Sequence, residues 1–266
     1  MMRARAGELF VDIAAPAAVA LVFLSAWEWI VRAQAIPPYI LPGPLLIAQT
    51  LWTDGPSLMT SLWVTLRTTL AALASATVLG LALAIALAQS RLIERSFYPY
   101  LVILQVTPIV SIAPLIIIWV NDVFLSLLVC AWLVAFFPIV ANTTLGLNSI
   151  DRGHADLFRL YRASRWQRLV HLRLPTALPY FLAGVRISGG LALIGAVVAE
   201  FVAGSGGAES GLAFRILEAG YRLQIPRLFA ALLLLSLAGI LIHAALGLAT
   251  RRILRGWHES AVMDRS

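Results

Sequence analysis

The chain contains several predominantly apolar blocks of about 20 residues, and these blocks constrain its fold more than any other feature. A helix rises about 1.5 Å per residue, so a run of this length spans a hydrocarbon core about 30 Å thick. Apolar residues account for 61% of the chain and charged residues for 12%, whereas soluble domains average roughly 45–50% and about 25%. The sequence therefore excludes an ordinary soluble enzyme and indicates a protein that crosses the membrane several times.

Six apolar segments are predicted to cross the membrane as helices. Each is continuously apolar rather than alternating at every second residue, and each is far longer than a barrel strand. The predicted fold class is therefore all-α, a polytopic membrane protein with a single transmembrane domain over residues 1–266. The predicted spans are residues 11–31, 62–88, 99–120, 123–147, 178–203 and 228–249.

The basic residues between these segments predict which way the chain faces. All 20 Lys and Arg residues are Arg, and with both termini in the cytoplasm 14 of them fall on the inner side and 5 on the outer side. Cytoplasmic loops carry the excess of basic residues in membrane proteins, so we expect both termini to be cytoplasmic. The arginines form no surface interleaved with aromatic residues, and we therefore expect no nucleic-acid partner.

The third segment combines two prolines with polar side chains. Each proline removes a backbone donor and crowds the carbonyl one turn back, so this segment is expected to be kinked. A kink can be packing geometry tolerated by neighbouring helices, or it can line a substrate path. The polar side chains can likewise hydrogen-bond a solute or join helices. The candidate path residues here are Gln105, Thr107, Pro108 and Ser111.

Glu200 is a further candidate for the translocation path, near the outer end of the fifth segment and before the glycine-rich stretch FVAGSGGAESG. An ionisable group at that depth is either a functional contact or an interfacial carboxylate paired with an outer arginine. We assign no catalytic residues and no metal site. The single cysteine, Cys130, is expected to be buried and inert, and the histidines share no metal-ligand spacing.

The longest inner connection, residues 148–177, is neither membrane material nor linker. Leu157, Leu160, Tyr161 and Ser164 fall on one helical face, and arginines occupy much of the remainder. The pattern predicts a short amphipathic helix at the inner surface, followed by a second short segment that Pro175 ends. From composition alone, such a helix rests on anionic headgroups, binds nucleic acid or docks on a soluble partner.

In this connection the sequence resembles the membrane subunits of bacterial ABC importers of type I. Their inner loop carries Glu-Ala-Ala, three residues, Gly, nine residues, then an aliphatic residue, any residue and Leu-Pro. Counting back from Pro175 puts Arg162 at the glycine and Asp156 at the glutamate. The stretch ASRWQRLVHLRLPTALPYFLAGVRIS is similar to the branch that imports sulfonates, taurine, nitrate and pyrimidine-type precursors, and ILPGP and AVVAEFVAGSGGAESGL extend the resemblance along the chain.

The chain departs from the family pattern at the glycine and at both alanines, which are replaced by Leu157 and Phe158. A glycine at a helix junction supplies backbone freedom, so Arg162 predicts either a continuous helix or a different turn. The resemblance implies that residues 156–168 form a coupling loop for a separate ATPase. The implied coupling residues are Asp156, Leu157, Leu160, Tyr161, Arg162, Ala163, Ser164, Arg165, Arg168 and Pro175.

The resemblance also implies the partners and the class of function. The chain would be a permease in the bacterial inner membrane, with two nucleotide-binding subunits, a second permease copy as a homodimer and an external substrate-binding protein. It has no GxxxxGK[ST] phosphate loop, so we expect no enzyme and no cofactor of its own; ATP and Mg would bind to the partner ATPase. The expected substrate is a small organic compound, sulfonate-like or pyrimidine-like. An inorganic anion such as nitrate is the alternative substrate, and a secondary carrier or channel the alternative class.

Overall fold

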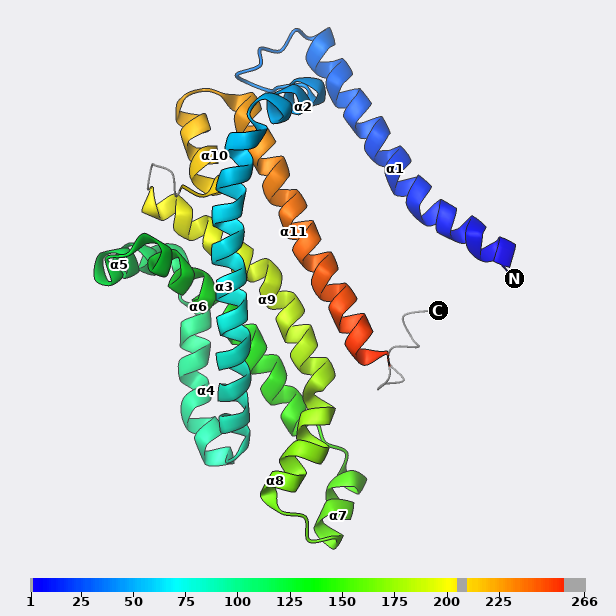
Figure 1. Ribbon diagram of the computed structural model, residues 1–266, viewed down its shortest axis with the longest axis vertical. Coiled ribbons are helices and arrows are strands. Elements are labelled where there is room, and N and C mark those ends of the chain that lie inside the picture. Colours follow the sequence, from blue (N-terminus) through cyan, green and yellow to red (C-terminus); the bar gives the residue numbers. More distant parts are fainter. Residues whose placement is uncertain (1, 205–209, 256–266) are drawn as a thin grey trace. The chain divides into compact units, whose positions relative to one another are not determined.

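The computed structural model describes residues 2–204 and 210–255, with side-chain surroundings from residue 14 onward (Figure 1). The middle of the predicted glycine-rich outer segment, 205–209, lies outside the described residues. Regular elements in the described residues are helices, including one π-helical stretch, η1. They are α1 Met2–Ala33, α2 Pro44–Thr53, α3 Gly55–Ala88, α4 Arg91–Val106, α5 Ile109–Val120, α6 Val123–Asn148, α7 Arg152–Leu160, α8 Arg165–Arg168, η1 Leu169–Arg173, α9 Leu174–Ala203, α10 Leu212–Tyr221 and α11 Ile225–Leu254.

Long apolar helices confirm the all-α polytopic prediction. Among the described residues, 5 helices are long and apolar enough to cross a membrane, or up to 6 if the bent pair α4–α5 counts as one span. The helices overrun the predicted segments, because polar end turns continue the helix beyond the apolar run. Thus the second predicted span begins at Gly55 in α3 rather than at residue 62.

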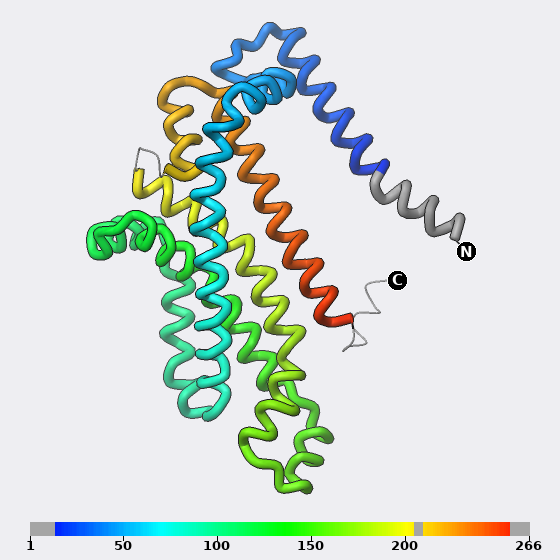
Figure 2. Tube along the Cα trace, viewed as in Figure 1, coloured from blue at the N-terminus to red at the C-terminus, as the bar shows by residue number. Residues whose placement is uncertain are grey.

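The predicted bend in residues 99–120 is confirmed, but the segment is not one helix. α4 begins earlier, at Arg91, and the segment breaks into α4 and α5, whose axes differ by 96° (Figure 2). The break falls at Thr107 and Pro108, which both have extended backbone. Proline has no N–H and disfavours helical geometry in the residue before it, so Thr107 leaves the helix. Pro114 lies within α5.

The described chain divides into two compact units, one of Met1–Thr60 with Arg215–Leu234 and the other of Ser61–Phe214 with Leu235–Ser266. In the first unit, Pro44 stands in the first turn of α2, a position that needs no backbone donor. The Glu28 carboxylate accepts the Leu45 N–H at 3.1 Å and pairs with Arg32 at 2.6 Å. Asp54 and Arg227 form a second ion pair at 3.4 Å.

The second unit is built on the close packing of α6 against α9. Glycines allow this approach: a Cβ added at Gly184 would lie 2.9 Å from the Pro138 carbonyl oxygen, and one at Gly195 would lie 2.9 Å from Ala131 Cα. The Ser188 hydroxyl also donates to the Ala135 carbonyl at 2.6 Å. Small residues let membrane helices bring their backbones together in this way.

Two further helices of the second unit pack on this pair. α3 approaches α6 at Gly80, whose added Cβ would meet Ile139 at 2.9 Å. α5 contributes Ala113 and Ile116 to a buried cluster that includes Cys130, which confirms that the cysteine is buried. α5 therefore packs against the helix pair α6 and α9. The α7–α8 connection lies beyond the ends of these two helices (Figure 1).

Candidate coupling loop and translocation cavity

The connection after α6 begins with a helix cap. The Asp151 side chain accepts the backbone N–H groups of Gly153 at 2.9 Å and His154 at 3.2 Å, and it thereby starts α7. These donors stabilise the carboxylate, so they hold the pKa of Asp151 below its ordinary value. A single acidic side chain therefore fixes where the loop helix starts.

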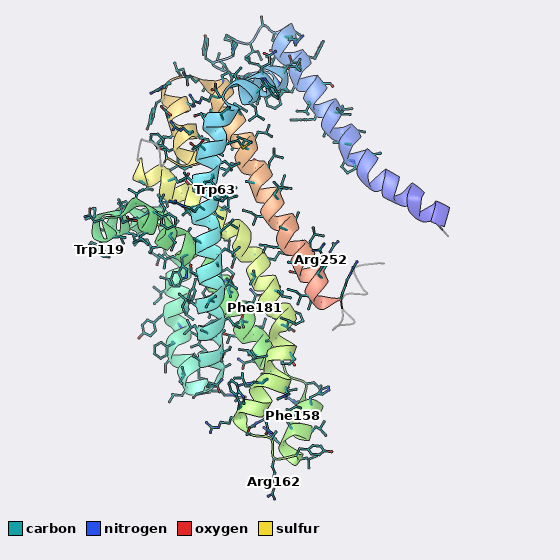
Figure 3. The ribbon with its side chains drawn as sticks, in the orientation of Figure 1. Trp63, Trp119, Phe158, Arg162, Phe181 and Arg252 are labelled. Atoms are coloured by element: carbon teal, nitrogen blue, oxygen red, sulfur yellow. The ribbon has the colours of Figure 1, made fainter. Side chains whose placement is uncertain are left out.

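α7 ends at Leu160, so the predicted continuous helix through Arg162 is wrong, and the alternative of a turn there is right. Arg162 has φ of 50°, in the left-handed region. The Ala163 N–H bonds to the Phe158 carbonyl and the Arg162 N–H to the Arg159 carbonyl, both at 2.9 Å. This pair of bonds is the Schellman motif, whose left-handed residue is usually glycine. The position at which the family pattern has glycine is left-handed in this chain, and it is occupied by Arg162. Figure 3 labels this side chain.

The second loop helix begins with a capping box. Ser164 accepts the Gln167 N–H at 3.2 Å, and the Gln167 side chain accepts the Ser164 N–H at 2.8 Å. Ser164 therefore caps α8. The periodicity had placed it on the α7 face, and that prediction is wrong. α8 continues through η1 into α9, where Pro175 stands in the first turn. The prediction that Pro175 ends the helix is wrong: α8, η1 and α9 run on as one helix over Arg165–Ala203, and the π-helical stretch η1 lies directly before the proline.

The loop presents apolar side chains to its surroundings. Leu157 is 47% exposed, Leu160 81% and Tyr161 80%. Beside them a hollow of about 410 Å³ is lined by Phe158, Ala163 and others from α7, α8 and η1. Asp156 pairs with Arg159 at 3.3 Å in an exposed position. The predicted apolar face therefore exists over Leu157, Leu160 and Tyr161, and in the chain alone it is uncovered.

The α4–α5 break opens a cavity of about 320 Å³ against α6 and α9. Three predicted path residues, Gln105, Thr107 and Pro108, line it. The Thr107 hydroxyl donates back to the Ile103 carbonyl at 2.7 Å, which leaves the Gln105 amide as the larger polar group of the lining. Ser111 is exposed on the first turn of α5 and is not part of this lining.

Glu200 lies elsewhere, buried at the end of α9 with 2% of its surface exposed. Its carboxylate accepts the Ala213 N–H of α10 at 3.0 Å, while Thr65 of α3 accepts the adjacent Leu212 N–H at 2.8 Å. A Cβ at Gly211 would overlap the carboxylate. Glu200 is therefore not the interfacial partner of an outer arginine within the described chain. Glu200 and Thr65 together accept the first two N–H groups of α10, one each.

Sequence reasoning missed two residues that hold these sites together. Thr65 lies 147 residues from the N–H that it accepts, so no local pattern could reveal the pair. Arg173 donates to the Ala88 carbonyl at 2.7 Å and thereby ties η1 to the end of α3. The sequence showed Arg173 only as an arginine beside an apolar span. An arginine in that place can equally well face lipid headgroups, so the contact with α3 could not be predicted.

Comparison with known proteins agrees with this architecture. Residues 76–255 match the model of a family described as binding-protein-dependent transport system inner membrane component. The formylaminopyrimidine transport permease protein ThiX of Halalkalibacterium halodurans is 35% identical over 228 residues, covering 85% of this chain and 89% of the relative. The riboflavin transport system permease protein RibX of Chloroflexus aurantiacus is 35% identical over 244 residues, 90% and 88% of the two chains.

More distant relatives and a solved structure extend the comparison. The taurine transport system permease protein TauC of Escherichia coli is 29% identical over 244 residues, which cover 89% of this chain and 87% of the relative. The crystal structure of an amino acid ABC transporter with histidines contains a chain that superposes with a TM-score of 0.62 at 16% identity. The superposition covers 77% of this chain and 97% of that one, and it supports the fold.

Proposed function

The chain belongs to the family of binding-protein-dependent transport system inner membrane components, and we propose that a separate ATPase drives it through the α7–α8 loop. In this proposal the chain forms the translocation path of an ATP-driven importer. It works as a homodimer with two ATPase subunits and an external substrate-binding protein. The observation that carries the coupling assignment is the uncovered apolar face of Leu157, Leu160 and Tyr161 on a chain that has no phosphate loop.

Burial energetics favour a protein partner at this face. Covering a leucine or a comparable apolar side chain stabilises an interface by about 1.5–3 kcal/mol. Leu160 and Tyr161 stand at the end of α7, where the Schellman turn fixes their direction, so little ordering is needed on docking. A groove on a partner subunit could hold this helix by its apolar residues.

Mutation of the face tests the coupling assignment. The variant Asp156→Arg with Leu160→Asp should still insert into the membrane but lose co-purification of the ATPase, because it places charges where apolar contacts are needed. The matched control is Leu92→Asp, which changes a leucine that is 75% exposed at the start of α4 and outside the apolar face. Retained ATPase binding and uptake in the double variant would exclude docking at this face. Absence of any ATPase from the wild-type preparation would favour a secondary carrier or channel.

The lining of the break cavity supports a small organic substrate. It has apolar side chains, the Gln105 amide and the Thr107 hydroxyl, and it has no charged side chain. An inorganic anion would leave its charge without a partner there, which costs free energy in a cavity of low polarity. We therefore propose a compound of the formylaminopyrimidine or riboflavin type over nitrate, in keeping with the relatives of 35% identity.

The substrate proposal is tested on the assembled transporter with its binding protein. ATP hydrolysis is measured with formylaminopyrimidine, riboflavin, taurine and nitrate in turn. Gln105→Ala should weaken the response to a heterocyclic compound, and Ser111→Ala, outside the cavity lining, serves as the control. Stimulation by nitrate alone, unaffected by Gln105→Ala, would contradict the assignment.

A further inference from the structure

A second cavity, of about 380 Å³, lies on the loop side of the second unit, between the end of α3, the start of α4 and the α7–η1 connection. We call it the arginine cavity. Five arginines line it, and the lining contains no carboxylate. They are Arg91, Arg159, Arg165, Arg168 and Arg173.

The described chain neutralises these guanidinium groups only in part; Glu94 of α4, which is outside the lining, acts electrostatically on Arg173. Arg159 pairs with the exposed Asp156, and Arg173 donates to the Ala88 carbonyl. Within residues 14–204 and 210–255, Arg91, Arg165 and Arg168 form no ion pair. The Nε of Arg168 is buried and has no acceptor. A buried donor without an acceptor is costly, and so is a cluster of like charges in a confined space.

The arginine cavity and the apolar face lie on opposite sides of α7. Successive residues of a helix turn by about 100°. Ala155 and Arg159, which are four apart, therefore share the side that lines the arginine cavity, while Leu157 and Tyr161 share the other. A partner docked on the apolar face would thus leave the arginines without acceptors. Arg91, Arg159 and Arg165 are exposed, so water can reach their guanidinium groups. The buried Nε of Arg168 is the donor that a ligand in this concave site would satisfy.

We propose that the arginine cavity binds a phosphate-bearing anion. Arginine forks match phosphate oxygens in bidentate geometry, and a phosphate supplies several acceptors at once. Bound there, the anion links α7 and α8 to α3 and α4, because each of these elements contributes to the lining or adjoins it. The phosphate can come from an anionic lipid headgroup or from a soluble phosphate compound.

The test measures thermal denaturation of the purified full chain in a neutral detergent. Dioleoyl phosphatidylglycerol and inorganic pyrophosphate are titrated separately, with dioleoyl phosphatidylcholine as the zwitterionic reference. We expect the denaturation midpoint to rise with phosphatidylglycerol, and the apparent Kd to weaken at least about tenfold in Arg165→Gln with Arg168→Gln, since two charge-assisted contacts are lost. A response to the lipid alone identifies a headgroup site. A response to pyrophosphate as well identifies a soluble phosphate site.

Arg152→Gln with Arg252→Gln is the matched control, because it removes the same charge from exposed residues outside the cavity lining. The single variant Arg165→Gln serves if the double variant fails to fold. Equal weakening in the control, or no response from either anion in the wild type, would overturn the proposal. So would an unchanged anion response in the cavity variant together with loss of the ATPase, which would assign the arginines to the partner subunit.

Discussion

Replacing Gly195 by alanine should destabilise the protein, whereas the same change at Gly190 should stabilise it. Both glycines lie in α9. At Gly195 the new Cβ would lie 2.9 Å from Ala131 Cα, a backbone atom of α6, but at Gly190 nothing lies within 4 Å. A backbone atom cannot rotate away, so α6 and α9 must separate. Overpacking of this kind costs typically about 1–3 kcal/mol.

The pair of variants isolates the steric cost. Glycine to alanine in a helix interior gains about 1 kcal/mol in either variant, so this gain cancels in the comparison. For a chain of this size each 1 kcal/mol shifts the midpoint by roughly 2–4 °C, which predicts a separation of about 2–12 °C between the variants. The 8 tryptophans report the midpoint by fluorescence in detergent. A Gly195→Ala midpoint equal to or above that of Gly190→Ala would refute the close approach of α6 and α9.

Changes at four further residues test the loop and the buried carboxylate. Glu200→Ala should lower the thermal midpoint, because it leaves a buried N–H of α10 without an acceptor at a cost of about 1–3 kcal/mol; Glu200→Gln keeps an acceptor oxygen and should lower it less. Arg162→Gly should slow amide exchange at the end of α7 and Arg162→Val should speed it, since a left-handed residue other than glycine costs roughly 1–3 kcal/mol. Equal exchange rates in the two variants would refute backbone strain at residue 162. The pKa of Asp151 is lowered in the folded protein, so the stabilisation from its cap is fully present above the ordinary pKa near 3.9 and is lost as the pH falls through the folded-state pKa. Amide exchange in α7 should therefore rise below about pH 4. The Asp151→Asn variant should not show this rise. Asn148→Leu should lower uptake per ATP hydrolysed in the assembled transporter, and an unchanged ratio would exclude a transmitting role for that side chain.

Local chemistry made much of the fold predictable. Runs of apolar residues predicted the membrane helices, because the hydrocarbon core requires both length and helical hydrogen bonding. Local chemistry also explains the start of α6: Asp122, a residue type that caps helices, accepts the Leu125 N–H at 2.7 Å directly after the left-handed Asn121. In these cases each residue acts on neighbours within one turn.

The errors arose where local signals compete or where distant residues meet. Two prolines indicated a bend at residues 99–120, but the sequence did not say that Pro108 would break the helix and that Pro114 would be accommodated. Glu200 was noticed for its charge, yet its role depends on the N-terminus of α10, which the fold brings to it. Arg159 of α7 and Arg165 and Arg168 of α8 were expected only as the basic side of an amphipathic helix, and it is the fold that gathers them with Arg91 and Arg173.

The two ends of the loop are attached to different helices, which bears on how a force applied at α7 would travel. At one end, the Asn148 amide donates to the Glu94 carboxylate of α4 at 3.1 Å. At the other, Arg173 holds the Ala88 carbonyl of α3 at 2.7 Å. α4 then leads directly to the break at Pro108, and α6 leads to Pro138, which lines the same cavity. Under the coupling proposed above, a displacement of the loop would reach the cavity along α4 and α6 together, and it would change the angle between α4 and α5 without unfolding either helix. The Asn148→Leu variant cuts the first attachment and leaves the second, so uptake should become uncoupled in part rather than abolished.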